Sequence, residues 1–244
     1  MLLPIRRRGR YGCYSQFSSP MKSPFALISL SISLLLAVPA ARCAPVKVAC
    51  VGDSITFGMG TPAGWDYPSQ LQRMLGAGYM VRNFGVSGTT LLHNGDRPYD
   101  ATPALEAALD WQADVTILML GANDTKPQNW GAHQAEFEGD YRALAARLLA
   151  ANPGGKLFVC RPTWISLNGA YGINEKTVGL EIPIIDKVAA SMRLQEIDMH
   201  AAIQGHPEYL VDTVHPNGTG ASALARAAYR AIKGADFAGT VPAP

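Results

Sequence analysis

The sequence predicts a three-layer α/β/α sandwich, in which helices cover both faces of a parallel sheet. Segments with strand pattern alternate along the chain with segments of helical spacing, as in α/β domains. The expected strands are apolar throughout, which is typical of strands buried on both faces. The chain has 244 residues, 48% hydrophobic and 16% charged, enough for one well-cored domain. We expect this domain at residues 45–236.

The first half of the domain contains three expected strands and two expected helices. An apolar run at 46–51 ends at a glycine and predicts the first strand. Apolar residues at helical spacing predict a helix over 67–75, again followed by glycine. A second strand is expected at 80–84, a helix at 103–111, and an apolar run predicts a buried strand at 114–120.

The second half continues the alternation. A long amphipathic helix is expected at 137–149, before an Asn-Pro-Gly-Gly turn. The fourth strand is predicted at 156–160. A helix at 182–192 carries a proline at its second position, which suits a first turn. The fifth strand is expected at 194–199 and the last helix at 221–233, followed by glycine.

The N-terminal segment 1–44 is typical of an export signal. Lys22 precedes the apolar stretch Phe25–Val38, and small residues follow, so cleavage is expected near Ala40–Ala44. A membrane anchor is the alternative, but about 14 apolar residues are few for a membrane span. We therefore expect a periplasmic or extracellular bacterial protein without stable membrane insertion after cleavage. Residues 237–244 are expected to form a C-terminal tail.

The charge and the cysteines exclude several classes of function. Residues 1–44 hold six of the 21 basic residues and none of the 19 acidic ones, leaving 15 basic residues against 19 acidic ones. Such a mildly acidic body does not favour binding to nucleic acid or to anionic membranes.

No Cys/His spacing predicts a zinc site, no glycine motif predicts a bound nucleotide, and no cofactor is expected. Cys50 and Cys160 could pair in an oxidising compartment, but we expect buried free thiols, because their strands need not be neighbours. The sequence does not indicate an oligomeric state.

Polar residues and glycines follow the expected strands at their carboxyl ends. Ser54 follows the first strand, Gly88 the second and Asn123 the third, while Asp212 and His215 come after the fifth. Ligands of parallel α/β sheets bind at this edge. We therefore expect these five residues to lie close together.

These residue types fit a nucleophilic hydrolase. A serine needs a neighbouring base, and His215 can accept the proton of Ser54. Asp212 can orient the imidazole and stabilise its protonated form. The backbone N–H groups of Ser54 and Gly88 and the side-chain amide of Asn123 can stabilise a tetrahedral oxyanion.

Other interpretations exist for single residues. Ser54 could be only a helix N-cap, since serine is favoured there. Ser87 is an alternative nucleophile, but its surroundings do not match the Gly-x-Ser-x-Gly elbow. Asp53, next to Ser54, is expected to bond nearby backbone and to have a structural role.

Four segments together resemble the sequence blocks of the SGNH/GDSL hydrolases. They are Gly52–Thr56, Asn83–Gly88, Gly121–Asp124 and Asp212–Pro216, in the order and approximate spacing of that family. The resemblance implies a flavodoxin-like five-stranded sheet of order 2-1-3-4-5. It also implies Ser54 as nucleophile, the Asp212/His215 pair, and Gly88 and Asn123 as oxyanion donors. Tyr67–Leu71 and the second block are similar to secreted bacterial carbohydrate-acetylesterase-like members.

Aromatic residues on expected loops suggest the substrate. Trp65, Trp130, Trp164 and Tyr171 are expected to reach the active edge, where aromatic faces suit sugar rings. Single tryptophans could equally be core residues. We expect an exported esterase that removes short acyl groups, in particular acetyl, from carbohydrates. The alternatives are a lysophospholipase or thioesterase acting on longer chains, and a catalytically silent carbohydrate-binding module.

Overall fold

The computed structural model describes residues 44–166 and 169–243 and contains a five-stranded sheet. The order β2-β1-β3-β4-β5 and the parallel pairing of all neighbours confirm the expected fold class and strand order. The expected leader lies outside the described residues apart from Ala44. The strands are β1 (Val46–Gly52), β2 (Tyr79–Gly85), β3 (Val115–Met119), β4 (Lys156–Arg161) and β5 (Gln195–Asp198).

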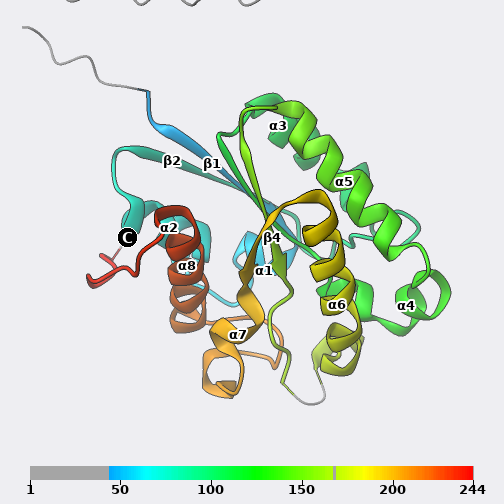
Figure 1. Ribbon diagram of the computed structural model, residues 1–244. Helices are drawn as coiled ribbons and strands as arrows, with labels where there is room; N and C mark the ends of the chain where they lie inside the picture. Colours follow the sequence, from blue (N-terminus) through cyan, green and yellow to red (C-terminus); the bar gives the residue numbers. More distant parts are fainter. Residues whose placement is uncertain (1–43, 167–168, 244) are drawn as a thin grey trace, which may run out of the picture. The chain divides into compact units, whose positions relative to one another are not determined.

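Helices cover both faces of the sheet (Figure 1). Successive side chains of β1 point to opposite faces, so Cys50 joins one core cluster and Val51 the other. One cluster includes side chains from α2 (Tyr67–Leu75), α7 (Met199–Ile203) and α8 (Gly218–Lys233). The other is formed with α3 (Pro103–Trp111), α5 (Phe137–Ala151) and much of α6 (Glu175–Met192).

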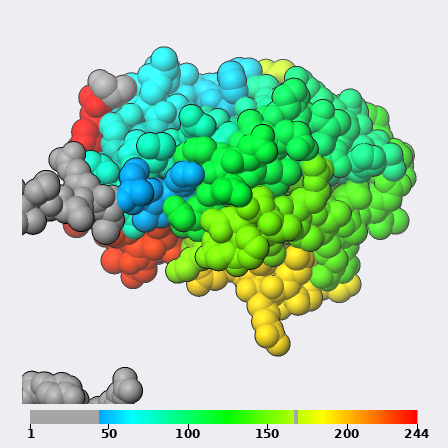
Figure 2. Space-filling view, turned by 90° about the horizontal axis from the view of Figure 1, so that it is seen from above, coloured from blue at the N-terminus to red at the C-terminus, as the bar shows by residue number. Residues whose placement is uncertain are grey.

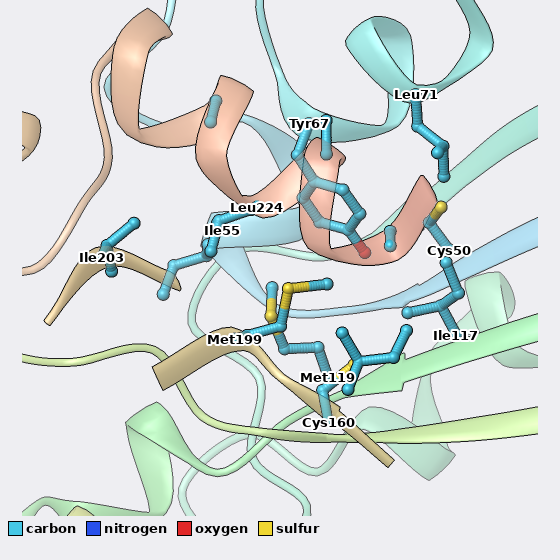
Figure 3. Packing of buried hydrophobic residues seen from close by; sticks show 14 of the residues in the cluster. Cys50, Ile55, Tyr67, Leu71, Ile117, Met119, Cys160, Met199, Ile203 and Leu224 are labelled. Atoms are coloured by element: carbon cyan, nitrogen blue, oxygen red, sulfur yellow. The ribbon is translucent and has the colours of Figure 1, made fainter. Parts of the chain in front are cut away.

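The first of these clusters contains both cysteines of the described chain. Figure 3 shows Tyr67 with its ring directed into the cluster, among Cys50, Cys160 and Met199. Both cysteines are fully buried and free, which confirms the prediction of buried thiols. Strand β3 lies between their two strands. Burial raises the pKa of the Cys50 thiol to about 12, so it behaves as a small apolar group.

Helix α6 differs from its prediction. It begins at Glu175, seven residues before the expected start, because the Asn174 side chain caps it by accepting a hydrogen bond from the Thr177 N–H at 2.9 Å. Pro183 therefore lies inside the helix, and its expected place in a first turn is wrong. The side of α6 at Pro183 is exposed, so the carbonyl left without an N–H partner can bond water.

Short helices and early starts were also not predicted. Helix α8 begins at Gly218, before the expected residue 221, because Asn217 caps it. Helix α7 shortens the fifth strand at its carboxyl end. The other helical segments are α1 (Ser54–Phe57), α4 (Pro127–His133) and the 3-10 turns Tyr99–Ala101, Ala122–Thr125, Ala170–Gly172 and Pro207–Tyr209.

The segment expected to be a C-terminal tail packs against the domain. The Phe237 ring meets Tyr229 edge-on at 5.2 Å between centroids, and the Arg226 guanidinium donates to the backbone carbonyls of Phe237 and Gly239. Figure 2 shows the molecule from above in space-filling form, with the residues near the start of β1 in blue. None of the described helices is long and apolar enough to cross a membrane.

Candidate active site

Strand β1 places Ser54 at the start of a short helix. Ser54 is the first residue of α1, and the Asp53 carboxylate caps that helix by accepting from the Ile55 N–H at 2.9 Å. This confirms the prediction that Asp53 bonds nearby backbone. The N-cap of α1 is Asp53 and not Ser54. Gly52 permits the tight turn, because a Cβ there would lie 2.5 Å from the Met119 carbonyl oxygen. The first-turn N–H of Ser54 has no acceptor within its own helix.

Three side chains form a continuous chain of hydrogen bonds. The Ser54 Oγ lies 2.9 Å from the His215 Nε2. The His215 Nδ1 lies 2.7 Å from the Asp212 Oδ2. Ser54 and His215 are buried, at 7% and 6% exposure, although 161 positions separate them in the sequence. The structure thus brings together the serine, histidine and aspartate that the sequence predicted, at distances suited to proton transfer.

The turn from Asp212 to His215 is held from two sides. The Asp212 Oδ1 accepts from the His215 N–H at 2.7 Å, which fixes the two residues relative to each other. Thr213 has a φ of 73°, and its backbone and side-chain oxygens accept from the N–H groups of Ser166 and Ala170. Burial opposes ionisation of Asp212, but the hydrogen bonds from His215 outweigh it and lower the pKa of Asp212 below its usual value. The carboxylate therefore stays negative beside the imidazole.

Donors for an oxyanion lie beside Ser54. Gly88 has a φ of 80°, a conformation that favours glycine, and it lines the same cavity as Ser54. The buried Asn123 side chain uses one amide hydrogen to bond the Thr89 carbonyl at 3.1 Å, and this amide carries a second hydrogen. Together with the Ser54 N–H, these groups could stabilise negative charge on a substrate oxygen.

The cavity above Ser54 has a volume of about 250 Å³. Its lining includes Tyr171, which the sequence analysis named, and three residues that it did not single out, Met59, Lys126 and Ile173. The Tyr171 hydroxyl donates to the Asp212 Oδ2 at 3.2 Å, and its ring meets the His215 ring edge-on at 5.7 Å between centroids. Tyr171 itself is exposed and has a φ of 62°. It therefore contacts both members of the Asp/His pair from the solvent side.

The three tryptophans predicted to bind substrate lie outside the cavity at Ser54. Trp130 is in helix α4 and is buried against Phe137, so it is not the loop aromatic that the sequence predicted. Trp164 is partly buried against the first core cluster. Trp65 lines a second, larger cavity. None of the three belongs to the described lining of the cavity at Ser54.

Other polar groups near the site have different roles. Ser87 lines the cavity, but its Oγ is buried and has no partner within the described part of the chain, so no base is in place to activate it. Asp124 is buried and accepts from the N–H groups of Leu91 and Leu92 at 2.9 and 2.7 Å. Burial raises the pKa of Asp124 to about 7 and that of Asp53 to about 6. Residues 44–166 and 169–243 contain no cluster of His, Cys, Asp and Glu suited to a metal ion.

Comparisons with known proteins show to which family the chain belongs. Residues 50–223 match the model of the GDSL-like Lipase/Acylhydrolase family. The chain is 38% identical over 220 residues to an acetylxylan esterase of Xylanibacter ruminicola, and the match covers 82% of this chain but only 45% of that protein. The chain thus spans about half the length of this relative.

Solved structures show the same fold. A carbohydrate acetylesterase from Sinorhizobium meliloti superposes with a TM-score of 0.65 at 21% identity, covering 78% of this chain and 99% of the other. A mutant of an acetyl-xylooligosaccharide esterase from Geobacillus Stearmophilus gives a TM-score of 0.59 at 22% identity, covering 79% and 96%. At these identities the likeness concerns the fold.

Proposed function

Because this chain belongs to the GDSL-like lipase/acylhydrolase family, we propose that it is a serine esterase that removes short acyl groups, chiefly acetyl, from carbohydrates. The hydrogen-bonded series Ser54–His215–Asp212 carries the proposal, since it joins a nucleophile, a base and an orienting carboxylate. The acetylxylan esterase relative supports acetylated carbohydrate as the substrate class.

The proposed reaction proceeds in two steps. The Ser54 Oγ attacks the ester carbonyl while His215 Nε2 takes its proton, and the oxyanion receives hydrogen bonds from Gly88, Asn123 and Ser54 itself. His215 then gives the proton to the departing sugar hydroxyl, leaving an acyl-enzyme. Water, deprotonated by His215, attacks this acyl group and releases the carboxylic acid. Asp212 stabilises the imidazolium in both steps.

The size of the cavity supports a short acyl group. Cavities that enclose drug-sized ligands measure about 300–1,000 Å³, and the cavity at Ser54 has about 250 Å³. Met59 and Ile173 supply apolar surface for a methyl group. A long acyl chain would extend beyond this space into solvent.

The test is acetate release from acetylated xylooligosaccharides by the mature protein, with Ser54→Ala as the matched control. We expect release by the unsubstituted protein and a loss of at least about 10³-fold in kcat for the variant. Release of acetate by neither protein, with no labelling of Ser54 by a fluorophosphonate, would exclude the proposed mechanism and favour a silent binding module.

A chain-length series separates the second enzymatic candidate. With p-nitrophenyl esters from acetyl to octanoyl, we expect kcat/KM to fall as the chain outgrows the cavity. A preference for octanoyl would instead indicate a lysophospholipase or thioesterase.

We also propose that the protein is exported, and the sequence of residues 1–44 is the evidence for this part of the proposal. The sequence Lys22, Phe25–Val38 and the small residues at 39–41 supports it. N-terminal sequencing of protein recovered from the periplasm or medium is expected to begin near Ala40–Ala44. Recovery of the uncleaved chain in the membrane fraction would contradict it.

A further inference from the structure

A second cavity, larger than the one at Ser54, lies beside the candidate active site and has no role in the reaction above. Its volume is about 680 Å³. The loop before α2, the start of α8 and the C-terminal segment form its walls. The lining residues are Gly60, Pro62, Trp65, Gln70, Asn217, Gly218, Thr219, Ser222, Arg226, Thr240 and Val241, which we call the Trp65 groove.

The Trp65 groove and the catalytic cavity share a wall. Met59 lines the catalytic cavity, and the next residue, Gly60, lines the groove. A Cβ on Gly60 would lie 3.1 Å from the His215 Cβ, so the groove begins one side chain away from the catalytic histidine. A second segment also joins the two cavities, because Asn217, which lines the groove, follows His215 by two positions. A chain-like substrate held at Ser54 would extend into this groove.

The indole of Trp65 is left open toward the groove. A Cβ on Gly218 would stand 3.6 Å from the indole ring, in van der Waals contact, and glycine leaves that space empty. The guanidinium of Arg73 lies 5.8 Å from the ring centroid and helps to hold the indole in place. An aromatic surface of this kind suits the C–H face of a pyranose ring.

Uncharged hydrogen-bonding groups surround the indole. Gln70 is 1% exposed, and its Nε2 donates to the carbonyls of Trp65 and Gly218 at 2.7 and 2.9 Å. Its Oε1 has no partner within the described residues, although a buried amide oxygen without one is costly. Thr219 and Ser222 add hydroxyl groups.

The charge of the groove is nearly neutral. Arg226 is the one charged residue among the described lining, and two of its nitrogens already donate to the carbonyls of Phe237 and Gly239. An anionic ligand would therefore find no free cluster of positive charge. Hydroxyls, amides and one aromatic face together select a neutral, hydroxyl-rich ligand.

We propose that the Trp65 groove binds the sugar chain of the substrate next to the acetylated residue. This proposal rests on the proposed esterase function and names the part of the substrate that the second cavity holds. The small cavity holds the acetyl group, and the groove holds one or more neighbouring pyranose rings. Binding there lowers KM for oligosaccharides and leaves small esters unaffected.

The first experiment compares two substrates in four proteins. They are the unsubstituted protein, Trp65→Ala, Ser222→Tyr, which adds a large side chain to the lining of the groove and keeps Trp65, and Trp111→Ala. Trp111 packs against Phe84 in the other core cluster and is the matched control for loss of a tryptophan. We expect both groove variants to raise KM for acetylated xylooligosaccharides roughly tenfold. Hydrolysis of p-nitrophenyl acetate stays within twofold, and Trp111→Ala changes neither substrate's KM.

The second experiment measures binding without turnover. Titration calorimetry of Ser54→Ala with unacetylated xylohexaose is expected to show binding that Trp65→Ala and Ser222→Tyr remove. Xylohexaose that does not bind Ser54→Ala, or that binds both groove variants as tightly as it binds Ser54→Ala alone, overturns the groove proposal. Failure of the proposed function looks different, because then the unsubstituted protein releases no acetate from any acetylated oligosaccharide.

Discussion

At the residue scale, Asn123 connects the interior of the domain to the site. It is buried, and its amide bonds the Thr89 carbonyl while the residue also lines the catalytic cavity. We expect Asn123→Ala to lower kcat by about 10²–10³ with little change in KM, because a donor to the oxyanion acts in the transition state. Steady-state kinetics on p-nitrophenyl acetate measure this.

The control for Asn123→Ala is Asn94→Ala, which removes an exposed amide bonded to Glu136. It is expected to leave kcat unchanged. A thermal melt of both variants separates loss of chemistry from loss of fold. A kcat that stays within threefold in a folded Asn123→Ala protein would remove Asn123 from the oxyanion donors.

Tyr171 is the second residue with a defined effect. Its hydroxyl bonds the carboxylate that orients His215, and its ring contacts the histidine. We expect Tyr171→Phe to lower kcat/KM about fivefold, which corresponds to about 1 kcal/mol for one exposed hydrogen bond. Tyr171→Ala, which also removes the ring, should lower it further. If the two variants are equally active, the hydroxyl alone matters.

The sequence predicted the residues of the site unevenly. Ser54, Asp212 and His215 follow strands directly or carry a recognisable spacing, so topology alone places them at one edge. The contact of Tyr171 with Asp212 depends on a backbone turn with positive φ at Tyr171, which no local pattern indicates. Trp130 was misplaced for the reverse reason, since the segment Pro127–His133 forms a helix that turns it into the core.

At the element scale, helix α6 carries an ionisable group into the core. Glu181 is fully buried, and neither carboxylate oxygen has a hydrogen-bond partner among the described residues. It lies under the turn before Asn123, since a Cβ on Gly121 would be 2.8 Å from its Oε2. Burial, then the charges of Asp124 and Asp53, raise the pKa of Glu181 well above its usual value. The Glu181 carboxyl therefore keeps its proton to a higher pH in the folded protein than an exposed glutamate does.

This predicts a pH-dependent cost in stability. Above the ordinary glutamate pKa of about 4.3, the unfolded chain loses this proton while the folded chain keeps it. Stability therefore falls as pH rises, by up to about 1.4 kcal/mol per pH unit until the folded pKa is reached. Between pH 5 and pH 8, we expect the melting temperature of Glu181→Leu to fall less than that of the unsubstituted protein. Glu181→Gln, which keeps the shape, should behave in the same way.

Asp124 and Asp53 titrate in the same direction and are present in all three proteins. Their contribution to the slope is shared, so the difference between the curves reports Glu181. Parallel melting curves over this pH range would show that the Glu181 carboxyl ionises in the folded protein as freely as in the unfolded one.

The elements themselves were predicted where packing leaves a regular pattern. The helix over 67–75 has clear helical periodicity and the buried strands are continuous apolar runs, and the structure has them within a few residues. The first turns of α6 and α8 lack a clear helical pattern in the sequence, because threonine and glycine, which have low helix propensity, stand within them or directly after them. Their starts depend on Asn174 and Asn217 as caps, and an asparagine before a glycine or glutamate equally suits a turn.

At the scale of the whole molecule, the strand order came from the family resemblance, while local pattern indicated only parallel strands with helices on both faces. Neither the resemblance nor the local pattern predicted where the C-terminal segment packs. Residues 237–244 carry few periodic apolar residues, yet Phe237 and Val241 pack against the core cluster formed with α8. The Arg226 side chain explains this, because it donates to two backbone carbonyls of the segment and stacks on the Phe237 ring at 5.4 Å.

Truncation after Asp236 should therefore destabilise the domain. The loss comprises one partly buried aromatic side chain and two hydrogen bonds from a charged group, for an expected decrease of roughly 2–3 kcal/mol in the free energy of unfolding. Urea denaturation measures it. Truncation after Val241 is the matched control, since the described residues beyond it are exposed, and we expect no change.

The same truncation bears on the second cavity, because Thr240 and Val241 form part of its wall. Removing them widens the Trp65 groove and frees the Arg226 side chain, while the hydrogen bonds of Ser54, His215 and Asp212 lie among other elements. We therefore expect the shortened protein, assayed below its melting transition, to keep its kcat/KM for p-nitrophenyl acetate and to show a raised KM for acetylated xylooligosaccharides. Equal losses on both substrates would mean that the chain end supports the fold of the site as a whole.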